Sequence, residues 1–106
     1  MGTMVSSVKA SVALTSTGQL QGYIAGSAAN LGPIRIVGIN AQASAADLTI
    51  TIYDATSASG DKVIHLKGCS AANESFNYSF GGNGVRCGTS AYIVLANCDR
   101  FVAYYG

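Results

Sequence analysis

Apolar and polar residues alternate along much of this chain. The clearest case is Leu48–Tyr53, where Leu, Ile and Ile alternate with Thr, Thr and Tyr. A period of two places successive side chains on opposite faces of a β-strand, and Thr and Ile are poor helix formers. The pattern predicts a strand with one buried face. No segment of the chain shows a convincing helical period.

The same alternation recurs between turn signals along the whole chain. Strands are predicted at Ser7–Leu14, Leu20–Ala25, Ile34–Ala41, Lys62–Lys67, Phe76–Phe80, Val85–Cys87 and Arg100–Tyr105, and the nearly all-apolar Ala91–Ala96 is typical of a central strand buried on both faces. Gly26–Gly32 is predicted to be a loop and Gly81–Gly84 a tight turn. Eight or nine short strands at regular spacing predict an all-β fold, a single-domain antiparallel β-sandwich that is jelly-roll-like.

The inward-facing apolar side chains of these strands form the predicted core. At about 1.5–3 kcal/mol for each large side chain that becomes fully buried, such a core offsets much of the entropy lost on folding. We therefore expect folding to require no cofactor and no metal. The predicted core consists of Val8, Val12, Leu14, Ile24, Ile36, Ile39, Leu48, Ile50, Ile52, Ile64, Leu66, Phe76, Phe80, Ile93, Leu95 and Phe101. The last strand should pair inside a sheet, because a free aromatic strand would be an adhesive edge.

Charge is scarce in this sequence. Hydrophobic residues make up 49% of the 106 residues and charged residues 10%, against about 25% charged residues in an average soluble protein. A soluble monomer normally carries a mixed, charged surface, so we expect neighbouring molecules to cover much of this one. The net charge is +1, with no basic cluster to neutralise phosphates, and no segment approaches the ~20 apolar residues of a membrane span. Neither nucleic acid nor membrane is an expected partner.

Candidate chemistry is sparse. His65 is the single histidine, no G-x-S-x-G motif is present, and each of the five carboxylates lies at or beside a predicted turn, where Asp caps backbone amides. A calcium site at Asp54–Asp61 is the alternative for that turn. The cysteines are Cys69, Cys87 and Cys98; their odd number argues against a disulfide framework and their spacing against zinc. A bridge between Cys87 and Cys98 remains open. We expect no enzyme activity.

Tyrosine is the residue type that favours an interaction role. The chain has six tyrosines and no tryptophan, and tyrosine is amphipathic and enriched at protein interfaces. The predicted strands place several tyrosines opposite apolar residues, where they would contact a neighbouring subunit or, alternatively, carbohydrate. The candidate interface residues are Tyr23, Arg35, Tyr53, His65, Arg86, Tyr92 and Tyr104, with His65 a possible pH-sensing contact.

The last third of the chain carries a family resemblance. Gly82-Asn83-Gly84-Val85-Arg86 precedes the apolar strand Ala91–Leu95, then Asn97, and a closing strand that ends Tyr104-Tyr105-Gly106. This pattern resembles the C-terminal half of small β-sandwich (jelly-roll-like) virion structural proteins of tailed bacteriophages, particularly marine ones. The segments Gln21–Ile24, Leu48–Tyr53 and Lys62–Leu66 fit the same order of strands, so the likeness covers most of the chain beyond Gly18. The resemblance implies a virion component with no catalytic residues to carry over.

Together these observations predict a phage capsid decoration or cement protein. It would bind the major capsid protein on the assembled head as a homo-oligomer, with a trimer favoured, and would reside in the virion after synthesis in the bacterial cytoplasm, because the N-terminus lacks a secretion signal. Met1–Thr15 is longer and more strand-like than the resemblance implies, and could be an arm exchanged between subunits. The alternative is a tail, nozzle or fibre component that binds other virion proteins or host surface carbohydrate.

Overall fold

The computed structural model describes residues 8–106, and all regular structure in this range is β-strand, as the sequence predicts. The strands are β1 (Lys9–Ala10), β2 (Gly18–Gln19), β3 (Gln21–Ile24), β4 (Ser27–Asn30), β5 (Ile34–Ala43), β6 (Leu48–Asp54), β7 (Asp61–Gly68), β8 (Ser75–Ser79), β9 (Val85–Cys87), β10 (Tyr92–Ala96) and β11 (Cys98–Tyr105). Their number exceeds the expected eight or nine, partly because the predicted loop at 26–32 contains β4, which pairs with β3.

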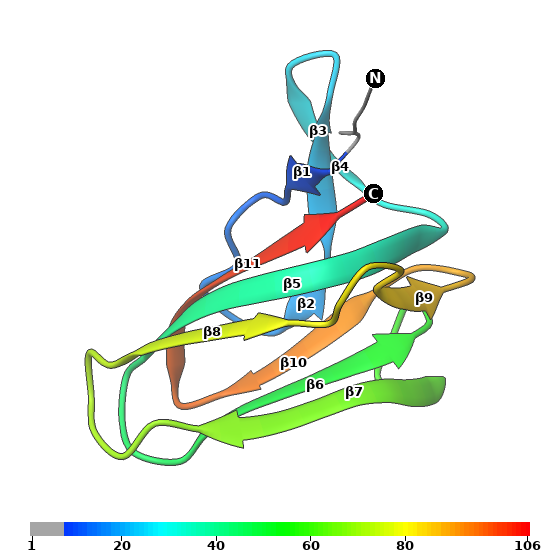
Figure 1. Cartoon of the computed structure of the whole chain (residues 1–106). Helices are drawn as coiled ribbons and strands as arrows, with labels where there is room; N and C mark the ends of the chain where they lie inside the picture. Colours follow the sequence, from blue (N-terminus) through cyan, green and yellow to red (C-terminus); the bar gives the residue numbers. More distant parts are fainter. Residues whose placement is uncertain (1–7) are drawn as a thin grey trace.

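Two antiparallel sheets form the layers of a β-sandwich (Figure 1). The upper sheet has the order β1-β11-β5-β8, and β9 also pairs with β5; the lower sheet has the order β2-β10-β6-β7. The closing strand β11 lies between β1 and β5, which confirms that it is paired inside a sheet. The β3–β4 hairpin is a third, small sheet that projects from the top of the two layers in Figure 1.

The core lies between the inner faces of the two sheets. Leu48, Ile50 and Ile52 of β6 are all buried, as their alternation predicts, and Ile36, Ile39, Ile64, Ile93 and Phe101 join them from the other strands. Leu14, Leu66, Phe76, Phe80 and Leu95 are only partly buried and pack against its margin, and Val12 is also only partly buried. Leu20, Leu31, Cys87, Ala91 and Tyr105 are buried without having been predicted.

For two residues, the prediction that they belong to the core is wrong. Val8 is 55% exposed and Ile24 is 57% exposed. Val8 precedes the first residue of β1, which pairs with β11 only through Lys9 and Ala10. Ile24 belongs to the outer end of the projecting hairpin, where neither layer of the sandwich covers it. Alternation indicates on which face of a strand each of these side chains lies. It does not indicate whether a second layer covers that face, and here none does.

The predicted strand at 7–14 is also shorter than expected. After β1, the buried Ser11 exchanges two hydrogen bonds with Ala103: its amide donates to the carbonyl oxygen at 2.8 Å, and its hydroxyl accepts from the amide at 2.9 Å. Leu14 then forms an isolated bridge with Phe101. Lys9, Ala10, Ser11 and Leu14 thus pair with β11 of their own chain, while residues 1–7 of the predicted arm lie outside the described residues. Exchange of the arm between subunits stays a prediction.

A bulge in β5 determines how the upper sheet is built. Tyr105 lies opposite Ile36 and Tyr104 opposite Gly38, so that Val37 is an extra residue in the ladder. A bulge shifts the alternation by one residue, and Ile36 and Ile39 therefore both point into the core. Val37 accepts a hydrogen bond from the Phe80 amide at 3.0 Å. The same strand consequently pairs with β9 before the bulge and with β8 after it.

Candidate interaction surface

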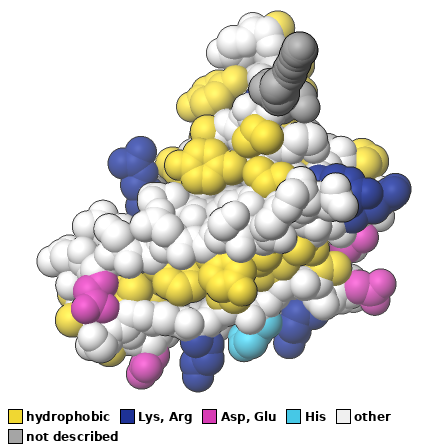
Figure 2. All heavy atoms as spheres, in the orientation of Figure 1, with side chains coloured by type: hydrophobic (Ala, Val, Ile, Leu, Met, Phe, Trp, Pro, Cys, Tyr) yellow, Lys and Arg dark blue, Asp and Glu magenta, His cyan; other side chains and the backbone are white. Residues whose placement is uncertain are grey.

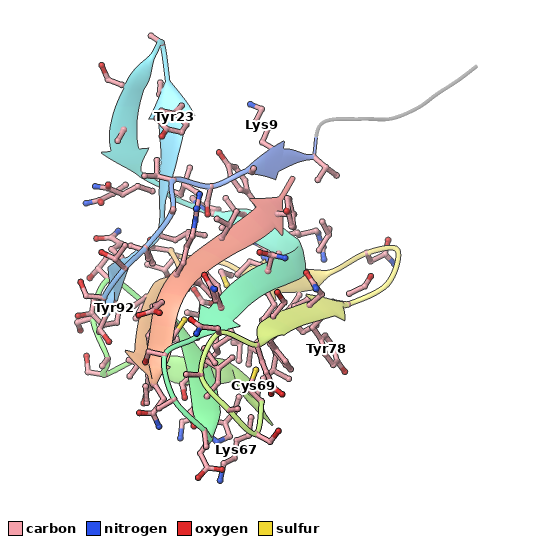
Figure 3. The ribbon with its side chains drawn as sticks, turned by 90° about the vertical axis from the view of Figure 1, so that its left-hand side faces the viewer. Lys9, Tyr23, Lys67, Cys69, Tyr78 and Tyr92 are labelled. Carbon is pink, nitrogen blue, oxygen red and sulfur yellow. The ribbon has the colours of Figure 1, made fainter. Side chains whose placement is uncertain are left out.

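The structure distributes the seven candidate interface residues over several surfaces. Tyr53 and Tyr92 lie directly opposite each other on β6 and β10, on the outer face of the lower sheet with His65. Tyr104 is on the outer face of the upper sheet, and Tyr23 is on the projecting hairpin, far from Tyr92 in Figure 3. These residues therefore do not form one continuous site, and their role as contacts stays a prediction.

His65 has a local structural partner. Its Nδ1 lies 2.9 Å from Oγ1 of Thr51, the residue opposite it on β6. Thr51 is buried, so this hydrogen bond provides a partner for a hydroxyl that has little access to water. Within residues 8–106, no group of three or more His, Cys, Asp or Glu side chains is arranged to hold a metal ion.

Arg35 and Arg86 face each other across β5 and β9. Both are exposed, and like charges directly opposite each other in a sheet are destabilising. The Arg35 guanidinium donates a long hydrogen bond of 3.4 Å to the carbonyl oxygen of Asn83. The two arginines line a shallow depression with Pro33, Ile34 and Gly106.

Asp54 fastens the end of β6 to the loop between β9 and β10. Its carboxylate accepts hydrogen bonds from the amides of Gly88 at 2.9 Å and Thr89 at 2.7 Å. The hydrogen bonds from Thr89 and then Gly88 are the main causes that hold the pKa of this carboxyl below its usual value, with a contribution from the positive charge of Arg86. The sequence predicted that Asp54 caps amides of its own turn; it caps amides that are remote in sequence.

The three cysteines are free thiols. Cys87 pairs with Ile34 and Cys98 with Ala43, at opposite ends of β5. Nine residues of extended strand span about 30 Å, whereas the Cα atoms of a disulfide lie within about 7 Å of each other. A bridge between Cys87 and Cys98, which the sequence left open, is therefore excluded. Burial raises the pKa of the Cys87 thiol to about 11, with a smaller contribution from the charge of Asp54.

A row of three aromatic side chains follows β8 and the residue after it: Phe76 and Phe80 are partly buried against the core, and Tyr78 between them is exposed. Phe76 and Tyr78 lie opposite the buried Ala41 and Ile39 of β5, so their side chains point to the inner side of the upper sheet. The ring centroids of Phe76 and Tyr78 are 6.5 Å apart, and those of Tyr78 and Phe80 are 4.9 Å apart. The three rings therefore form a continuous row along the strand.

This row lies at an open side of the sandwich. Below it, Val63 and Leu66 of β7 are only partly buried and pack against the margin of the core. We call these five side chains the aromatic seam. Figure 2 shows a hydrophobic band between the two layers, with charged side chains below it and at its ends. Tyr78 is 46% exposed and projects outward from the strand edge in Figure 3.

The two edge strands beside the seam differ in their protection. β7 carries Asp61, Lys62 and Lys67 and has an irregular register near Tyr53, features that block the addition of a further strand. β8 has the sequence Ser-Phe-Asn-Tyr-Ser, with no charge, no proline and a regular register. Among the described strands it pairs only with β5, so its outer edge is available to another chain.

The alternation of side chains did not predict this surface. It assigned Phe76 and Phe80 to the core and did not select Tyr78. Alternation identifies the inner face of β8 but not whether the opposite sheet extends far enough to cover it. An uncharged, aromatic edge strand was the available signal, and recognising it required knowing that β8 is an edge.

Comparison with models of known protein families, with curated proteins and with solved structures finds no match. The class is accordingly defined by the fold: an all-β, two-layer antiparallel sandwich. From Val8 to Gly106 it contains no helix capable of crossing a bilayer.

Proposed function

We propose that this chain is a structural protein of a phage particle, a decoration or cement protein that binds the assembled head. The observation that carries the proposal is the unprotected edge of β8 beside the aromatic seam. A hydrophobic surface of this kind marks a site of protein interaction. The scarcity of charged residues and the sequence resemblance to phage virion proteins support the same function.

The seam suits an extended segment of a capsid protein. Such a segment would add to the sheet at β8 through main-chain hydrogen bonds, and its alternate side chains would pack on Phe76, Tyr78 and Phe80. Burial of these rings would supply the hydrophobic part of the binding free energy. The basic side chains of Lys62 and Lys67 on the neighbouring edge would orient the partner by charge.

The mechanism of stabilisation is passive. A protein that binds the assembled shell and not its dissociated subunits stabilises the shell by mass action, at about 2.7 kcal/mol for each site when its free concentration is 100 times the dissociation constant. An oligomer would multiply this effect, because linked contacts bind with high effective concentration. No chemical step is required of any residue.

The first experiment measures copy number in purified phage particles. A copy number in the hundreds supports a shell protein, about a dozen supports a tail component, and absence from the particle overturns the proposal. Particles that lack the protein should release their genome at lower temperature or after osmotic shock. Unchanged particle stability would contradict the cement function.

The second experiment tests the surface. Tyr78→Lys gives the edge strand β8 a charged side chain of the kind that protects β7. The purified variant should therefore fail to bind to phage particles from which the wild-type protein is absent. Tyr104→Lys is the matched control, because Tyr104 is 40% exposed and lies on the outer face of the same sheet. Equal occupancy by both variants would refute docking through the seam.

A tail or fibre component that binds carbohydrate is the second candidate function, and one observation favours it. Tyr104 borders a shallow groove over Gly38, and Asn77 and Ser79 line the other side. An aromatic ring beside amide and hydroxyl groups is suited to a sugar ring. Binding to a glycan array that Tyr104→Ala abolishes would favour this function, and absence of glycan binding would eliminate it.

A further inference from the structure

The β3–β4 hairpin exposes apolar side chains on both of its faces. Tyr23 is 62% exposed and Ile24 is 57% exposed. Adjacent residues of a strand point to opposite faces, so each face of the hairpin presents one large apolar side chain. Figure 1 shows the hairpin standing clear of the two layers, and Figure 3 places Tyr23 on its free part.

The base of the hairpin is firmly attached to the body. Leu20 and Leu31, which flank the two strands, are buried and joined by a 3.1 Å hydrogen bond from the Leu31 amide to the Leu20 carbonyl oxygen. Gly22 lies against the ring of Tyr105, and a Cβ atom at position 22 would collide with that side chain. The hairpin is thus a fixed projection, although an isolated two-stranded hairpin is only marginally stable in water.

The hairpin itself also carries no charge, although Lys9 of β1 stands beside it in Figure 3. The segment 10–34 contains no Asp, Glu, Lys, Arg or His, and the projecting part of the molecule in Figure 2 shows no charged side chain. Copies of one chain that associate through this hairpin bring the same segment of every copy together, so identical charges on it would lie close to one another, and like charges across an interface are costly. An uncharged apolar surface avoids this cost, so its charge pattern fits a second copy of the same chain better than an oppositely charged partner.

We propose that the β3–β4 hairpin is the self-association element of this protein and that it builds a cyclic oligomer of three or more copies. A two-fold dimer would use the same face of both hairpins, which would leave Tyr23 or Ile24 uncovered. In a ring, the Tyr23 face of one copy packs against the Ile24 face of the next, and both faces become buried. The hairpin is separate from the seam, and the oligomer that it builds does not require a role in the virion.

The test is the mass of the purified full-length chain in solution, measured by light scattering after size-exclusion chromatography and by native mass spectrometry. The wild type should form a closed oligomer of at least three copies at micromolar concentration. Ile24→Lys and Tyr23→Lys should each dissociate it, and the milder Ile24→Thr, which keeps a β-branched side chain, should raise the dissociation constant by about tenfold or more. Circular dichroism and thermal melting establish that each variant is folded.

Tyr78→Lys is the control, because it alters an exposed tyrosine of the seam and should leave the oligomer intact. A wild type that is monomeric up to about 100 μM, a two-fold dimer, or an oligomer that survives both lysine substitutions in the hairpin would each overturn the inference. Particle binding tests docking through the seam, and the mass of the oligomer tests self-association through the hairpin. A Tyr78→Lys variant that loses particle binding but keeps the oligomer would show that the two proposals can fail independently.

Discussion

The ring of Phe76 lies directly over Gly68, on the opposite sheet: a Cβ atom at position 68 would come within 2.7 Å of ring atoms Cδ1 and Cε1. Gly68 ends β7 and Phe76 is the second residue of β8. The absence of a side chain at position 68 therefore lets the aromatic row approach the lower sheet and close this end of the seam.

Gly68→Ala should destabilise the protein by about 1–3 kcal/mol, because the added methyl group forces the Phe76 ring from its place. Urea denaturation measures the free energy of unfolding. Gly32→Ala is the matched control, since a Cβ atom at position 32 meets no atom within 4 Å, and it should be close to neutral. Equal stability of the two variants would show that the Phe76 ring is free to move.

Asp54 should govern part of the acid sensitivity of the fold. Its pKa lies below the ordinary value of 3.8 in the folded protein, mainly because the Thr89 and Gly88 amides donate to the carboxylate. A lowered folded-state pKa gives stability that is fully present above the unfolded-state pKa and is lost as pH falls through the folded-state value. Asp54→Asn should therefore reduce stability at pH 7 and make stability less dependent on pH below about 4.

The control for this variant is Asp99→Asn, at an exposed position in the register irregularity of β11. Melting temperatures between pH 2 and 7 should follow the wild-type curve in the control and flatten on the acid side in Asp54→Asn. Parallel curves for all three proteins would mean that the bonds to Gly88 and Thr89 do not persist in solution.

Cys87 should resist thiol reagents in the native protein. A thiol with a pKa of about 11 has about a hundredfold less thiolate at pH 8 than an ordinary cysteine, and its side chain is buried. Cys69 and Cys98 are partly exposed and should react first with a chromogenic disulfide reagent. Unfolding in guanidinium should make the third thiol, that of Cys87, reactive as well. A single fast phase for all three thiols in native buffer would contradict the burial of Cys87.

The cross-strand pair of Arg35 and Arg86 predicts a stabilising substitution. Arg35→Glu would replace a repulsive pair with an attractive one and should raise stability by a few tenths of a kcal/mol, up to about 1 kcal/mol. Arg35→Gln removes the repulsion alone and should give an intermediate melting temperature. Added salt should reduce the differences among the three proteins, and a destabilised Arg35→Glu variant would refute the prediction.

Strand periodicity alone predicted the all-β class, most strands and the centre of the core. Thr49, Ile50, Thr51 and Ile52 alternate so regularly that only one register buries both isoleucines, and the structure has that register. The pairing of β11 on both sides was likewise predictable, because an aromatic strand is costly at a free edge. These features depend on local side-chain direction, which a sequence encodes directly.

The location of surfaces was not predictable in the same way. Val8, Ile24 and Tyr78 lie in segments that alternate in the same way as the segments of the core. These three side chains are nevertheless exposed, because no layer lies opposite them. The bulge at Val37 that brings Ile36 and Ile39 to one face arises from pairing with β11, not from a local signal. The remote partners of Asp54 are likewise set by the packing of distant loops.

The sequence by itself determined which face of each strand is apolar, because the alternation of side chains is a property of the extended backbone. Only the tertiary structure decided which of those apolar faces are covered, because coverage depends on where the two sheets end relative to each other. The aromatic seam and the projecting hairpin are apolar surfaces that the sequence could describe and the packing of the layers left open.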